Sequence, residues 1–399
     1  MMDKYNIAVI GSGGREHAIC ATVARSSHVE KLYAIPGNAG ISQIAECVKI
    51  SAPDIDGIVA FCKENGINLV FVAPDDPLAL GLVDALEGNG IPTAEYATFD
   101  DYNEASAYLK NASFPLVIKA DGLALGKGVI IAMTRDEAKA AVRSMMEDKI
   151  FGESGSNVVI EEFLTGPEVS VLSFTDGKTV IPMISSQDHK RALDNDEGLN
   201  TGGMGTVAPN PYYTKDIADV CMETIFLPTV KAMAAEGRAF KGCLYFGLML
   251  TEKGPKVIEY NCRFGDPETQ VVLPLLESDL LTVMQATTNE TLDKCEVKFS
   301  NGNACCVIMA SKGYPSSYEK GYEITIPESV LPNVYVAGAS IKDSKLVTNG
   351  GRVLGVTKTA DTLECAISGA YELVKAIKFD NAFYRSDIGK RALMAKENK

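Results

Sequence analysis

The first 90 residues alternate between strand-like and helix-like patterns, and this alternation constrains the fold more than any other feature. The segment "NIAVIGSGGREHAICATVARS" is typical of a hydrophobic strand, a glycine turn and an amphipathic helix, and "KLYAIPGNAG" is typical of the next strand. A further helix, strand and helix follow in "IDGIVAFCKENGINLVFVAPDDPLALGLVDALEGNG". Such alternation predicts a parallel sheet with ligands at the carboxyl ends of its strands.

Length and charge exclude several classes of protein. A chain of 399 residues is too long for one core, so we expect several domains. The net charge of -14 argues against a nucleic-acid partner, because contact with phosphate backbones needs a basic surface. No run is long and apolar enough to cross a membrane, and the chain enters a strand directly, so we expect a cytoplasmic protein. The ten cysteines are scattered without a C-x-x-C pair, which favours reduced thiols.

A glycine-rich run, "KADGLALGKGV" at residues 119–129, invites comparison with the phosphate loop of P-loop NTPases. That loop needs glycine where this chain has Asp121, and Ser or Thr after the lysine, whereas a glycine follows Lys127. The flanking segments "PLVIK" and "GVIIA" both indicate strands, so the run joins strand to strand rather than opening a helix. The sequence therefore excludes a P-loop at this position.

The glycines at the start of the chain suit a small anion. Gly11, Gly13 and Gly14 follow a strand and open a helix, where free backbone N–H groups and the helix dipole favour phosphate. Glu16 stands where the dinucleotide fingerprint needs glycine, which disfavours a nicotinamide cofactor. A merely structural tight turn remains the alternative.

The segment "KVIEYNCRFGD" is the sharpest local signal for metal chemistry. On a strand, Val257, Glu259, Asn261 and Arg263 share one face. A carboxylate and an amide oxygen can coordinate one hard cation such as Mg²⁺, which takes its other ligands from water and phosphates. The arginine can meet phosphate, while the alternative is an ordinary solvated strand face.

Three further segments give weaker signals. "VVIEEFLTGPEVSV" is typical of a strand that leads into a linker, whose backbone can bond an adenine edge. The "DHKR" and "NTGGMG" segments, within the polar loop "SSQDHKRALDNDEGLNTGGMG", combine charge, amide and bare backbone, and so suit anionic small molecules. Each by itself could be a surface loop, and His189 alone is more typical of a structural histidine.

Together these segments resemble the ATP-grasp superfamily, and within it the phosphoribosylamine–glycine ligase family. The resemblance is carried, in order over nearly the whole chain, by "VIGSGGREHAI", "PGNAG", "VIKADGLALGKGV", "VIEEFLTGPEVS", "SSQDHKR", "NTGGMG", "EYNCRFGDPETQ", "VTNGGRVLGV" and "SDIGKRAL". It implies a multidomain α/β and α+β protein with an ATP-grasp fold. The domains implied are an N-terminal parallel α/β substrate domain (1–91), an ATP-grasp lid (92–163), an ATP-grasp catalytic domain (164–298) and a C-terminal α+β domain (299–399).

The resemblance also assigns residues to roles. In such a site the glycine-rich run is the lid loop over the phosphates of ATP, Lys119 and Arg263 are catalytic, and Glu259 and Asn261 hold Mg²⁺ or Mn²⁺. The residues implied for the nucleotide are Lys119, Gly122, Gly126, Lys127, Gly128, Glu161, Glu162, Phe163, Leu164 and Glu168. Those implied for the substrates are Gly13, Gly14, Arg15, Glu16, Gly37, Asn38, Asp188, His189, Lys190, Asn200, Gly202, Gly203 and Arg263.

The activity implied is the ATP-dependent ligation of glycine to 5-phosphoribosylamine through glycyl phosphate, a step of purine biosynthesis, by a monomer. No protein nucleophile is needed, which suits a chain without a convincing Cys–His or Ser–His pair. Three rivals stay open: another ATP-grasp ligase or carboxylase with a different acceptor, a nicotinamide oxidoreductase built on the first domain, and a non-catalytic nucleotide-binding regulator.

The chain departs from the family pattern at two places. It has "APDD" at residues 73–76 where the family commonly has "GPE", which affects the substrate contacts there. It also runs from "LEGNG" directly into "IPTAEY", where family members have another strand and helix of roughly 25 residues that carry a lysine near ATP. Because such a loss would expose a sheet edge, we predict that the segment exists in the molecule and is missing from this sequence between Gly88 and Ile91.

Overall fold

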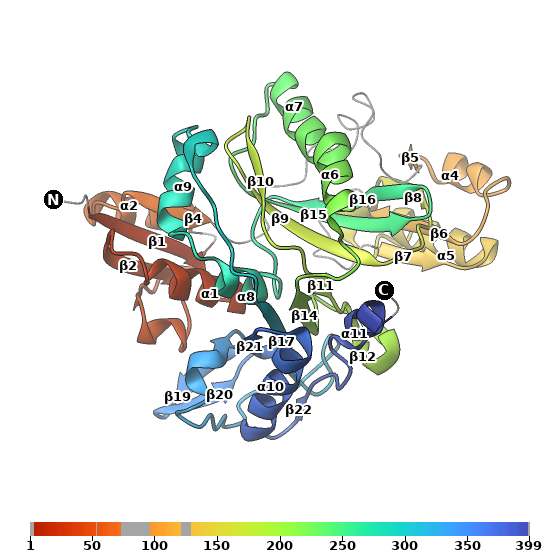
Figure 1. Ribbon diagram of the computed structural model, residues 1–399. Coiled ribbons are helices and arrows are strands. Elements are labelled where there is room, and N and C mark those ends of the chain that lie inside the picture. Colours follow the sequence, from red (N-terminus) through yellow and green to blue (C-terminus); the bar gives the residue numbers. More distant parts are fainter. Residues whose placement is uncertain (1–3, 53, 73–95, 121–128, 398–399) are drawn as a thin grey trace.

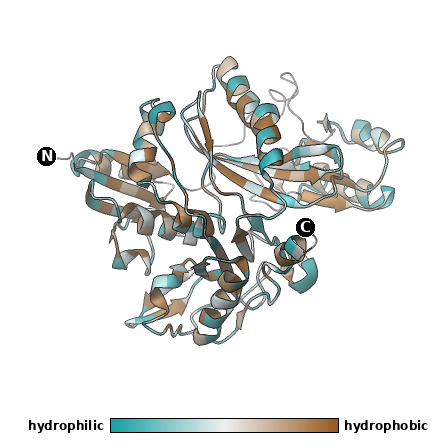
Figure 2. Ribbon diagram, viewed as in Figure 1, coloured by the Kyte–Doolittle hydropathy of each residue, from teal (hydrophilic) through white to brown (hydrophobic). Residues whose placement is uncertain are grey.

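The computed structural model describes residues 4–52, 54–72, 96–120 and 129–397, and these residues form four main sheets with helices around them (Figure 1). In Figure 1 the N-terminal sheet lies on the left, the lid sheet on the right, the central sheet between them and the C-terminal sheet below. The strands are largely hydrophobic (Figure 2). In the described part of the chain, no helix has the length and apolar character needed to span a membrane.

The N-terminal sheet is parallel throughout, as the strand–helix alternation predicts. Its strands lie in the order β3-β2-β1-β4, and every pair is parallel. The sheet and its helices are built from β1 (Tyr5–Gly11), α1 (Gly14–Val23), β2 (Val29–Pro36), β3 (Glu46–Cys47), α2 (Ile55–Glu64) and β4 (Leu69–Val72). Ile7 and Val9 of β1 pack with Ile19 and Val23 of α1 in a buried core. The helix expected after β4 falls on residues outside the described range.

The lid sheet is antiparallel, in the order β5-β8-β6-β7, and the two strands that flank the glycine-rich run pair with each other as predicted. It consists of β5 (Tyr96–Phe99), α4 (Tyr102–Tyr108), β6 (Leu116–Ala120), β7 (Val129–Ala132), α5 (Arg135–Met146) and β8 (Val158–Glu162). Helices α4 and α5 cover one face, where Ile118 and Ile160 meet Val142 in the core. The opposite face carries Lys119 and Glu161.

The central sheet has two different faces because side chains alternate along its strands. Its order is β10-β9-β15-β16, from β9 (Glu168–Thr175), β10 (Val180–Pro182), β15 (Gly242–Thr251) and β16 (Gly254–Asn261). One face packs Phe246 and Leu248 against Phe226, which lies between α6 (Lys215–Cys221) and α7 (Leu227–Ala235). The other face places Leu172 and Tyr245 in the same core as the N-terminal sheet.

The C-terminal sheet contains strands from two distant parts of the chain. Its order is β11-β14-β17-β21-β18, and β22 pairs with β17. These strands are β11 (Gln187–Asp188), β14 (Gly205–Ala208), β17 (Asn303–Ser311), β18 (Val334–Val336), β21 (Arg352–Ala360) and β22 (Ala382–Phe383). Thus β11 lies within the segment expected to be a polar loop, and β14 begins at the last residue of that segment. Both strands pair in this sheet, because β14 finds its partner in β17 about 100 residues later.

Two hairpins and four helices complete the described structure that bears on the site. The hairpins are β12 (Arg191–Leu193) with β13 (Glu197–Asn200), and β19 (Ala339–Lys342) with β20 (Lys345–Thr348). The helices are α8 (Thr269–Val272), α9 (Leu280–Thr288), α10 (Leu363–Ala376) and α11 (Lys390–Glu397). All ten cysteines are free thiols, as expected.

Candidate active site

Lys119 joins the lid sheet to the central sheet. Its Nζ lies 2.6 Å from Oε2 of Glu161 on the neighbouring strand β8 and donates to the carbonyl of Ile258 on β16 at 3.2 Å. The side chains of Lys119 and Glu161 are 22% and 15% exposed, so both remain partly accessible. The lysine expected on the phosphates of ATP therefore stands between the two sheets, beside the residue that precedes Glu259.

An ion pair crosses the same gap. Glu162 at the end of β8 pairs with Lys256 of β16. Phe163 and Leu164 follow directly and are half-buried. These residues therefore form the edge of the lid that is linked to β16, where adenine was expected. Gly122, Gly126, Lys127 and Gly128 lie outside the described residues.

The expected metal ligands Glu259 and Asn261 share a face of β16 as predicted, but Val257 does not lie on that face. Glu259 pairs in register with Gly247 and Asn261 with Tyr245, whereas Val257 pairs with Leu248. A β-bulge at this point inserts one extra residue into β16 and reverses the side-chain alternation. The prediction that Val257 lies on the same face was wrong, because Val257 is buried in the core under α6 and α7.

Lys190 lies between two carboxylates of this face. Its Nζ is 3.2 Å from Oε1 of Glu259 and 3.8 Å from Oε2 of Glu168, which is one of the residues implied for the nucleotide. The Lys190 ammonium holds the pKa of Glu259 below its ordinary value, with Lys119 and Arg263 adding to the effect. In turn Glu259 raises the pKa of Lys190 well above its ordinary value. The site therefore keeps Glu259 ionised and surrounds it with cations.

Glu259 and Asn261 suit a magnesium ion that takes most of its ligands from a bound nucleotide and from water. Glu259 and Asn261 offer one carboxylate and one amide oxygen from the same strand face. Within residues 4–52, 54–72, 96–120 and 129–397, no group of three or more His, Cys, Asp or Glu side chains could hold a metal by itself. Mg²⁺ commonly accepts one or two protein ligands and completes its shell with water and phosphate oxygens. The two residues are therefore sufficient for a nucleotide-bound ion.

Asp188 and His189 lie in the interior rather than on the surface. His189 donates from Nδ1 to the carbonyl of Gly205 at 3.1 Å, and its Nε2 accepts from the backbone N–H of Gly389 at 3.2 Å. Burial lowers the pKa of His189 to about 4, so the ring is neutral near pH 7. Burial raises the pKa of Asp188, and the nearby Glu268 carboxylate raises it further. His189 thus fixes the backbone that presents Asp188 and Lys190.

The "NTGGMG" turn is held by the C-terminal sheet. Arg352 donates from Nη1 to the carbonyl of Gly202 at 2.7 Å, and its contact with the carbonyl of Gly203 is longer, at 3.4 Å. The N–H of Gly202 donates to the hydroxyl of Tyr314 at 3.1 Å. Asn200, at the end of β13, is exposed. The backbone of this turn is therefore fixed, while the asparagine stays available to a ligand.

The turn before α1 is already occupied by carboxylates of the protein. The N–H of Gly13 donates to Glu16 Oε2, and Glu16 Oε1 accepts from Arg15 Nε at 2.6 Å. A Cβ on Gly13 would lie 3.5 Å from Oδ2 of Asp266, so that carboxylate is close to the turn as well. The free N–H groups expected at Gly13 and Gly14 are thus partly satisfied from within. Arg15 also donates from Nη1 to the carbonyl of Phe264 at 3.2 Å.

Asn38 binds the protein with both ends of its amide. Its Nδ2 donates to the carbonyls of Ser12 and Val336, each at 2.8 Å, and its Oδ1 accepts from the N–H groups of Gly40 and Ile41. Gly37, just before it, has a φ of +71°, which favours glycine. The "PGNAG" turn therefore shapes the site through its backbone, because the amide itself is fully engaged.

Sequence reasoning missed several polar residues of the same face. Ser170 and Tyr245 are 2.9 Å apart at their hydroxyls, and the Tyr245 hydroxyl donates to Oε1 of Glu268 at 3.2 Å. Burial raises the pKa values of both Tyr245 and Glu268. Ser170 and Tyr245 could have been predicted to lie on this face only from the alternation of side chains along β9 and β15. Glu268 lies within the quoted motif "EYNCRFGDPETQ" but was assigned no role.

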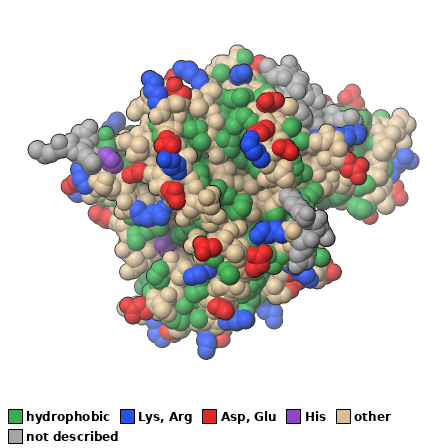
Figure 3. All heavy atoms as spheres, viewed as in Figure 1, with side chains coloured by type: hydrophobic (Ala, Val, Ile, Leu, Met, Phe, Trp, Pro, Cys, Tyr) green, Lys and Arg blue, Asp and Glu red, His purple; other side chains and the backbone are tan. Residues whose placement is uncertain are grey.

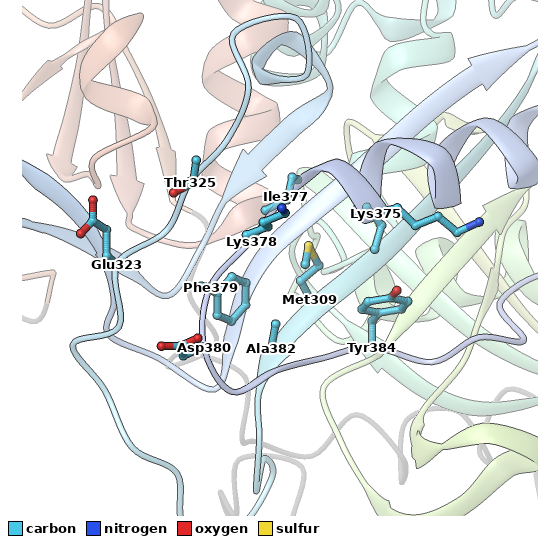
Figure 4. Close-up of a pocket in the computed structure, with 11 residues that line it drawn as sticks. Met309, Glu323, Thr325, Lys375, Ile377, Lys378, Phe379, Asp380, Ala382 and Tyr384 are labelled. Carbon is cyan, nitrogen blue, oxygen red and sulfur yellow. The ribbon is translucent and has the colours of Figure 1, made fainter.

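A surface pocket in the C-terminal sheet lies apart from all of these residues (Figure 4). It has a volume of about 780 Å³ and is lined by parts of β17, α10 and the segment that follows α10. Its lining includes the apolar side chains of Met309 and Phe379 and the carboxylates of Glu323 and Asp380. It contains no residue of the expected site. On the face drawn in Figure 3, basic and acidic side chains are interspersed.

Three family models match successive parts of this chain, in the order N domain, ATP-grasp domain and C domain. The family model for the N domain of phosphoribosylglycinamide synthetase matches residues 5–99, that for its ATP-grasp (A) domain residues 83–269, and that for its C domain residues 304–391. Among solved structures, phosphoribosylamine–glycine ligase from Thermotoga maritima superposes with a TM-score of 0.85 at 33% identity, covering 96% of this chain and 100% of that one. A biotin carboxylase domain from Hydrogenobacter thermophilus, solved with MgADP, superposes with a TM-score of 0.71 at 13% identity, covering 99% and 94%.

A curated relative bears on the short junction as well. Phosphoribosylamine–glycine ligase from Pasteurella multocida is 47% identical over 426 aligned residues, covering 98% of this chain and 99% of that protein. The alignment is longer than the 399 residues of this chain, so the relative has residues without a counterpart here. The residues from Glu87 to Pro92 lie outside the described range, so the missing segment stays a prediction. An intact mass of 42.7 kDa would contradict it.

These similarities extend over almost the full length of the chain and follow the same order of domains. The chain therefore belongs to the phosphoribosylamine–glycine ligase family, in which an ATP-grasp domain lies between an N domain and a C domain.

Proposed function

We propose that this chain ligates glycine to 5-phosphoribosylamine with ATP, giving glycinamide ribonucleotide, ADP and phosphate. The observation that carries the proposal is the position of Lys119. Its bond to the carbonyl of Ile258 places a lysine of the lid next to Glu259 and its strand neighbour Asn261. A phosphate-binding cation and two oxygen ligands for a metal thus meet at one gap between two sheets, which is the arrangement that phosphoryl transfer needs.

The nucleotide would bind between the lid sheet and β16. Lys119 would exchange Glu161 for a phosphate oxygen, since both side chains are partly accessible. Phe163 and Leu164 would contact adenine, Glu162 would lie beside them, and Glu168 would meet the ribose. The loop with Gly122, Gly126, Lys127 and Gly128 would close over the phosphates.

Magnesium, when bound to Glu259 and Asn261, would neutralise charge on the transferring phosphoryl group. This is also the ion in the MgADP complex of the biotin carboxylase domain from Hydrogenobacter thermophilus. Manganese is the alternative proposed for the same two ligands. Lys190 would have to leave Glu259 as the metal arrives, because its Nζ lies 3.2 Å from Oε1 of that carboxylate.

The reaction would proceed in two steps. A carboxylate oxygen of glycine attacks the γ-phosphorus of ATP, the bond to ADP breaks, and glycyl phosphate forms. The amine of phosphoribosylamine then attacks the acyl carbon, phosphate leaves, and the new amide nitrogen loses a proton. Lys119 and Arg263 would stabilise the phosphoryl charge by position alone, since both lie close enough to Glu259 to lower its pKa.

The substrates would bind where the N-terminal turn, the "DHK" segment and the "NTGGMG" turn meet. Two side chains are accessible there: Asn200 is exposed, and Lys190 is about one third exposed. The backbone of Gly202 and Gly203 would line the same space. The remaining residues proposed to shape this site are Gly13, Gly14, Arg15, Glu16, Gly37, Asn38, Asp188 and His189.

We further propose the domain boundaries 1–91, 92–163, 164–298 and 299–399, a cytoplasmic location and a monomer. The first three ranges are supported by the separate N-terminal, lid and central sheets, one in each range. The last boundary divides the chain but not the C-terminal sheet, which also contains β11 and β14. Sedimentation of the purified protein tests the monomer.

The proposal is tested by measuring ADP release while each component is left out in turn. We expect ADP only when Mg²⁺, glycine and phosphoribosylamine are all present, because the acyl phosphate is consumed by the amine. Replacing glycine by alanine or serine is the matched control and should give almost no turnover. Vigorous ADP release with another amino acid, or without the ribosylamine, would favour another ATP-grasp ligase. Oxidation of a reduced nicotinamide cofactor would favour an oxidoreductase instead.

A further inference from the structure

Three distant segments of the chain meet at the guanidinium of Arg352, the first residue of β21. Its Nη1 donates to the carbonyl of Gly202 and to the carbonyl of Asp266, each at 2.7 Å. The same nitrogen lies 3.4 Å from Oδ1 of Asp266. Arg352 thus joins the substrate turn, the turn after β16 and the C-terminal sheet. No role was assigned to Arg352 from the sequence.

The contact continues from Asp266 into the N-terminal helix. Oδ1 of Asp266 accepts from Nε2 of Gln270 at 2.8 Å, and its carboxylate also accepts from the backbone N–H of Arg15 at the start of α1. Burial alone would raise the pKa of Asp266, but Arg352 and Arg15 keep it below its ordinary value. The carboxylate therefore stays ionised and links Arg352 to the N-terminal turn that is proposed to face the substrates.

The substrate turn fits closely against Arg352. A Cβ added to Gly202 would lie 3.0 Å from Cζ of Arg352, so a larger residue would displace either the turn or the guanidinium. The carbonyl of Gly202 accepts from Arg352 and its N–H donates to the Tyr314 hydroxyl at 3.1 Å. Both backbone polar groups of this residue are therefore held by side chains from the C-terminal region.

The nucleotide side is held by other contacts. Lys119 reaches β16 through the carbonyl of Ile258, and Lys256 reaches the lid through Glu162. In the described part of the chain, the hydrogen bonds of Arg352 go to Gly202, Gly203 and Asp266, not to these residues. A change at Arg352 should therefore move the substrate turns and leave nucleotide binding intact.

We propose that Arg352 is a positioning residue for the ligation step, which fixes the Gly202 turn against Asp266 and so sets where the acyl group and the amine meet. The inference rests on the proposed function. A planar guanidinium can bond two carbonyls at once, whereas a lysine ammonium at the end of a flexible chain holds such a pair less well. Misplacement of reacting groups by about 1 Å costs about 100-fold in rate.

The test compares Arg352→Lys and Arg352→Met with the unchanged protein in the complete ligation assay. We expect Arg352→Met to lower kcat by about 100-fold and to raise the KM of glycine or phosphoribosylamine. Arg352→Lys should recover part of that loss, about 10-fold, because it keeps the charge and one bond. The Kd of MgADP, measured by calorimetry, should stay within about twofold in both variants, which a general loss of structure would not allow.

Arg391→Met is the matched control, since Arg391 is half-exposed and pairs with Asp196 at 3.0 Å away from the turn. It should keep normal turnover. Tyr314→Phe provides a milder change of the same turn, because it removes only the acceptor of the Gly202 N–H. We expect a smaller loss of kcat, about fivefold, again with normal MgADP binding.

The outcomes separate the two proposals. An unchanged protein that fails to ligate glycine overturns the proposed function itself. If that protein is active, unchanged kinetics in both Arg352 variants overturn the positioning role, and so does a loss of MgADP affinity in step with turnover. If the Arg352 variants do not fold, Tyr314→Phe decides: reduced kcat with intact MgADP binding supports the role, and normal kcat contradicts it.

Discussion

The nucleotide side and the substrate side of the site are held together in different ways. On the nucleotide side, two ion pairs lie at the gap between the lid and β16. Lys256 of β16 pairs with Glu162 of the lid, whereas Lys119 pairs with Glu161 within the lid and donates to the carbonyl of Ile258 across the gap. On the substrate side, side chains bond backbone groups: Asn38 engages four of them, and Arg352 bonds the carbonyls of Gly202 and Asp266.

The difference indicates which side has to change when the ligands bind. Ion pairs between partly exposed side chains contribute about 0–1 kcal/mol, so a phosphate or a metal can replace one partner at little cost. Each turn of the substrate side is held by several hydrogen bonds at once, which contribute about 0.5–1.5 kcal/mol each, so a turn held in this way stays in place. The molecule therefore combines an exchangeable nucleotide side with a fixed substrate side.

The largest expected effect concerns Glu259, where the two sides meet. Glu259→Ala should lower kcat by at least about 1,000-fold, or about 4 kcal/mol, because it removes the carboxylate proposed for the metal. The thermal midpoint should hardly change, since the Glu259 side chain is 44% exposed. The measurement is ADP release together with a thermal unfolding curve.

Glu252→Ala is the matched control, because Glu252 is an exposed residue in the turn between β15 and β16. It should keep normal activity. Near-normal turnover of Glu259→Ala would contradict the metal assignment and with it the proposed border between the two sides.

Lys119 tests the nucleotide side alone. Lys119→Met should lower kcat/KM for ATP by about 100-fold, because one donor to the transferring phosphate is lost. The KM of glycine should stay within about twofold, since the substrate turns keep their own contacts. Steady-state kinetics with each substrate varied in turn measures both values.

The control for this change is Lys110→Met, since Lys110 is exposed on the outer side of the lid just after α4. An effect of Lys119→Met on glycine rather than on ATP would break the division between the two sides.

The smallest expected effect concerns the contact between α1 and the C-terminal sheet, which is part of the fixed side. Nδ1 of His17 accepts from the N–H of Val336 at 2.8 Å, and burial lowers the pKa of His17 to about 4. The unfolded chain takes up a proton below its ordinary pKa of 6.5, whereas the folded ring stays neutral down to about 4. The free energy of unfolding therefore falls as the pH falls through this window, by about 1.4 kcal/mol per pH unit for this residue.

His17→Asn keeps an acceptor for Val336 but does not titrate. Urea unfolding at pH 5 and pH 6 should show a dependence on pH that is weaker by about 1.4 kcal/mol per unit in this variant. His189, whose pKa is also about 4, contributes its own dependence equally in both proteins. Above pH 7 the two proteins should respond alike, and equal slopes between pH 5 and pH 6 would show that His17 is not buried as a neutral ring.

Local patterns predicted the strands and helices well because they depend on neighbouring residues. The hydrophobic period and the positions of the glycines were enough to predict the strand, turn and helix over β1 and α1. They also predicted the strand pair β6 and β7. The shared face of Glu259 and Asn261 was also predicted correctly. The place of Val257 was not, since the bulge in β16 depends on how that strand pairs with β15.

The polar segment before β14 shows a second limit. Its residues suggested a loop, yet β11 within it is buried and pairs with β14, which in turn pairs with β17. Because that partner lies about 100 residues away, no local window could indicate the pairing. The sequence indicated a structural role for His189, but for the same reason its partners Gly205 and Gly389 could not be predicted.

The sequence by itself determined the order of the elements, the family and the residue types of the site, because motifs and side-chain periods are local properties of the chain. The tertiary structure decided which charges meet. It placed Lys190 against Glu259, the Asp266 carboxylate at the start of α1, and Arg352 on the carbonyls of Gly202 and Asp266. Such contacts join segments up to about 250 residues apart, and only the packing of the sheets brings them within hydrogen-bonding distance.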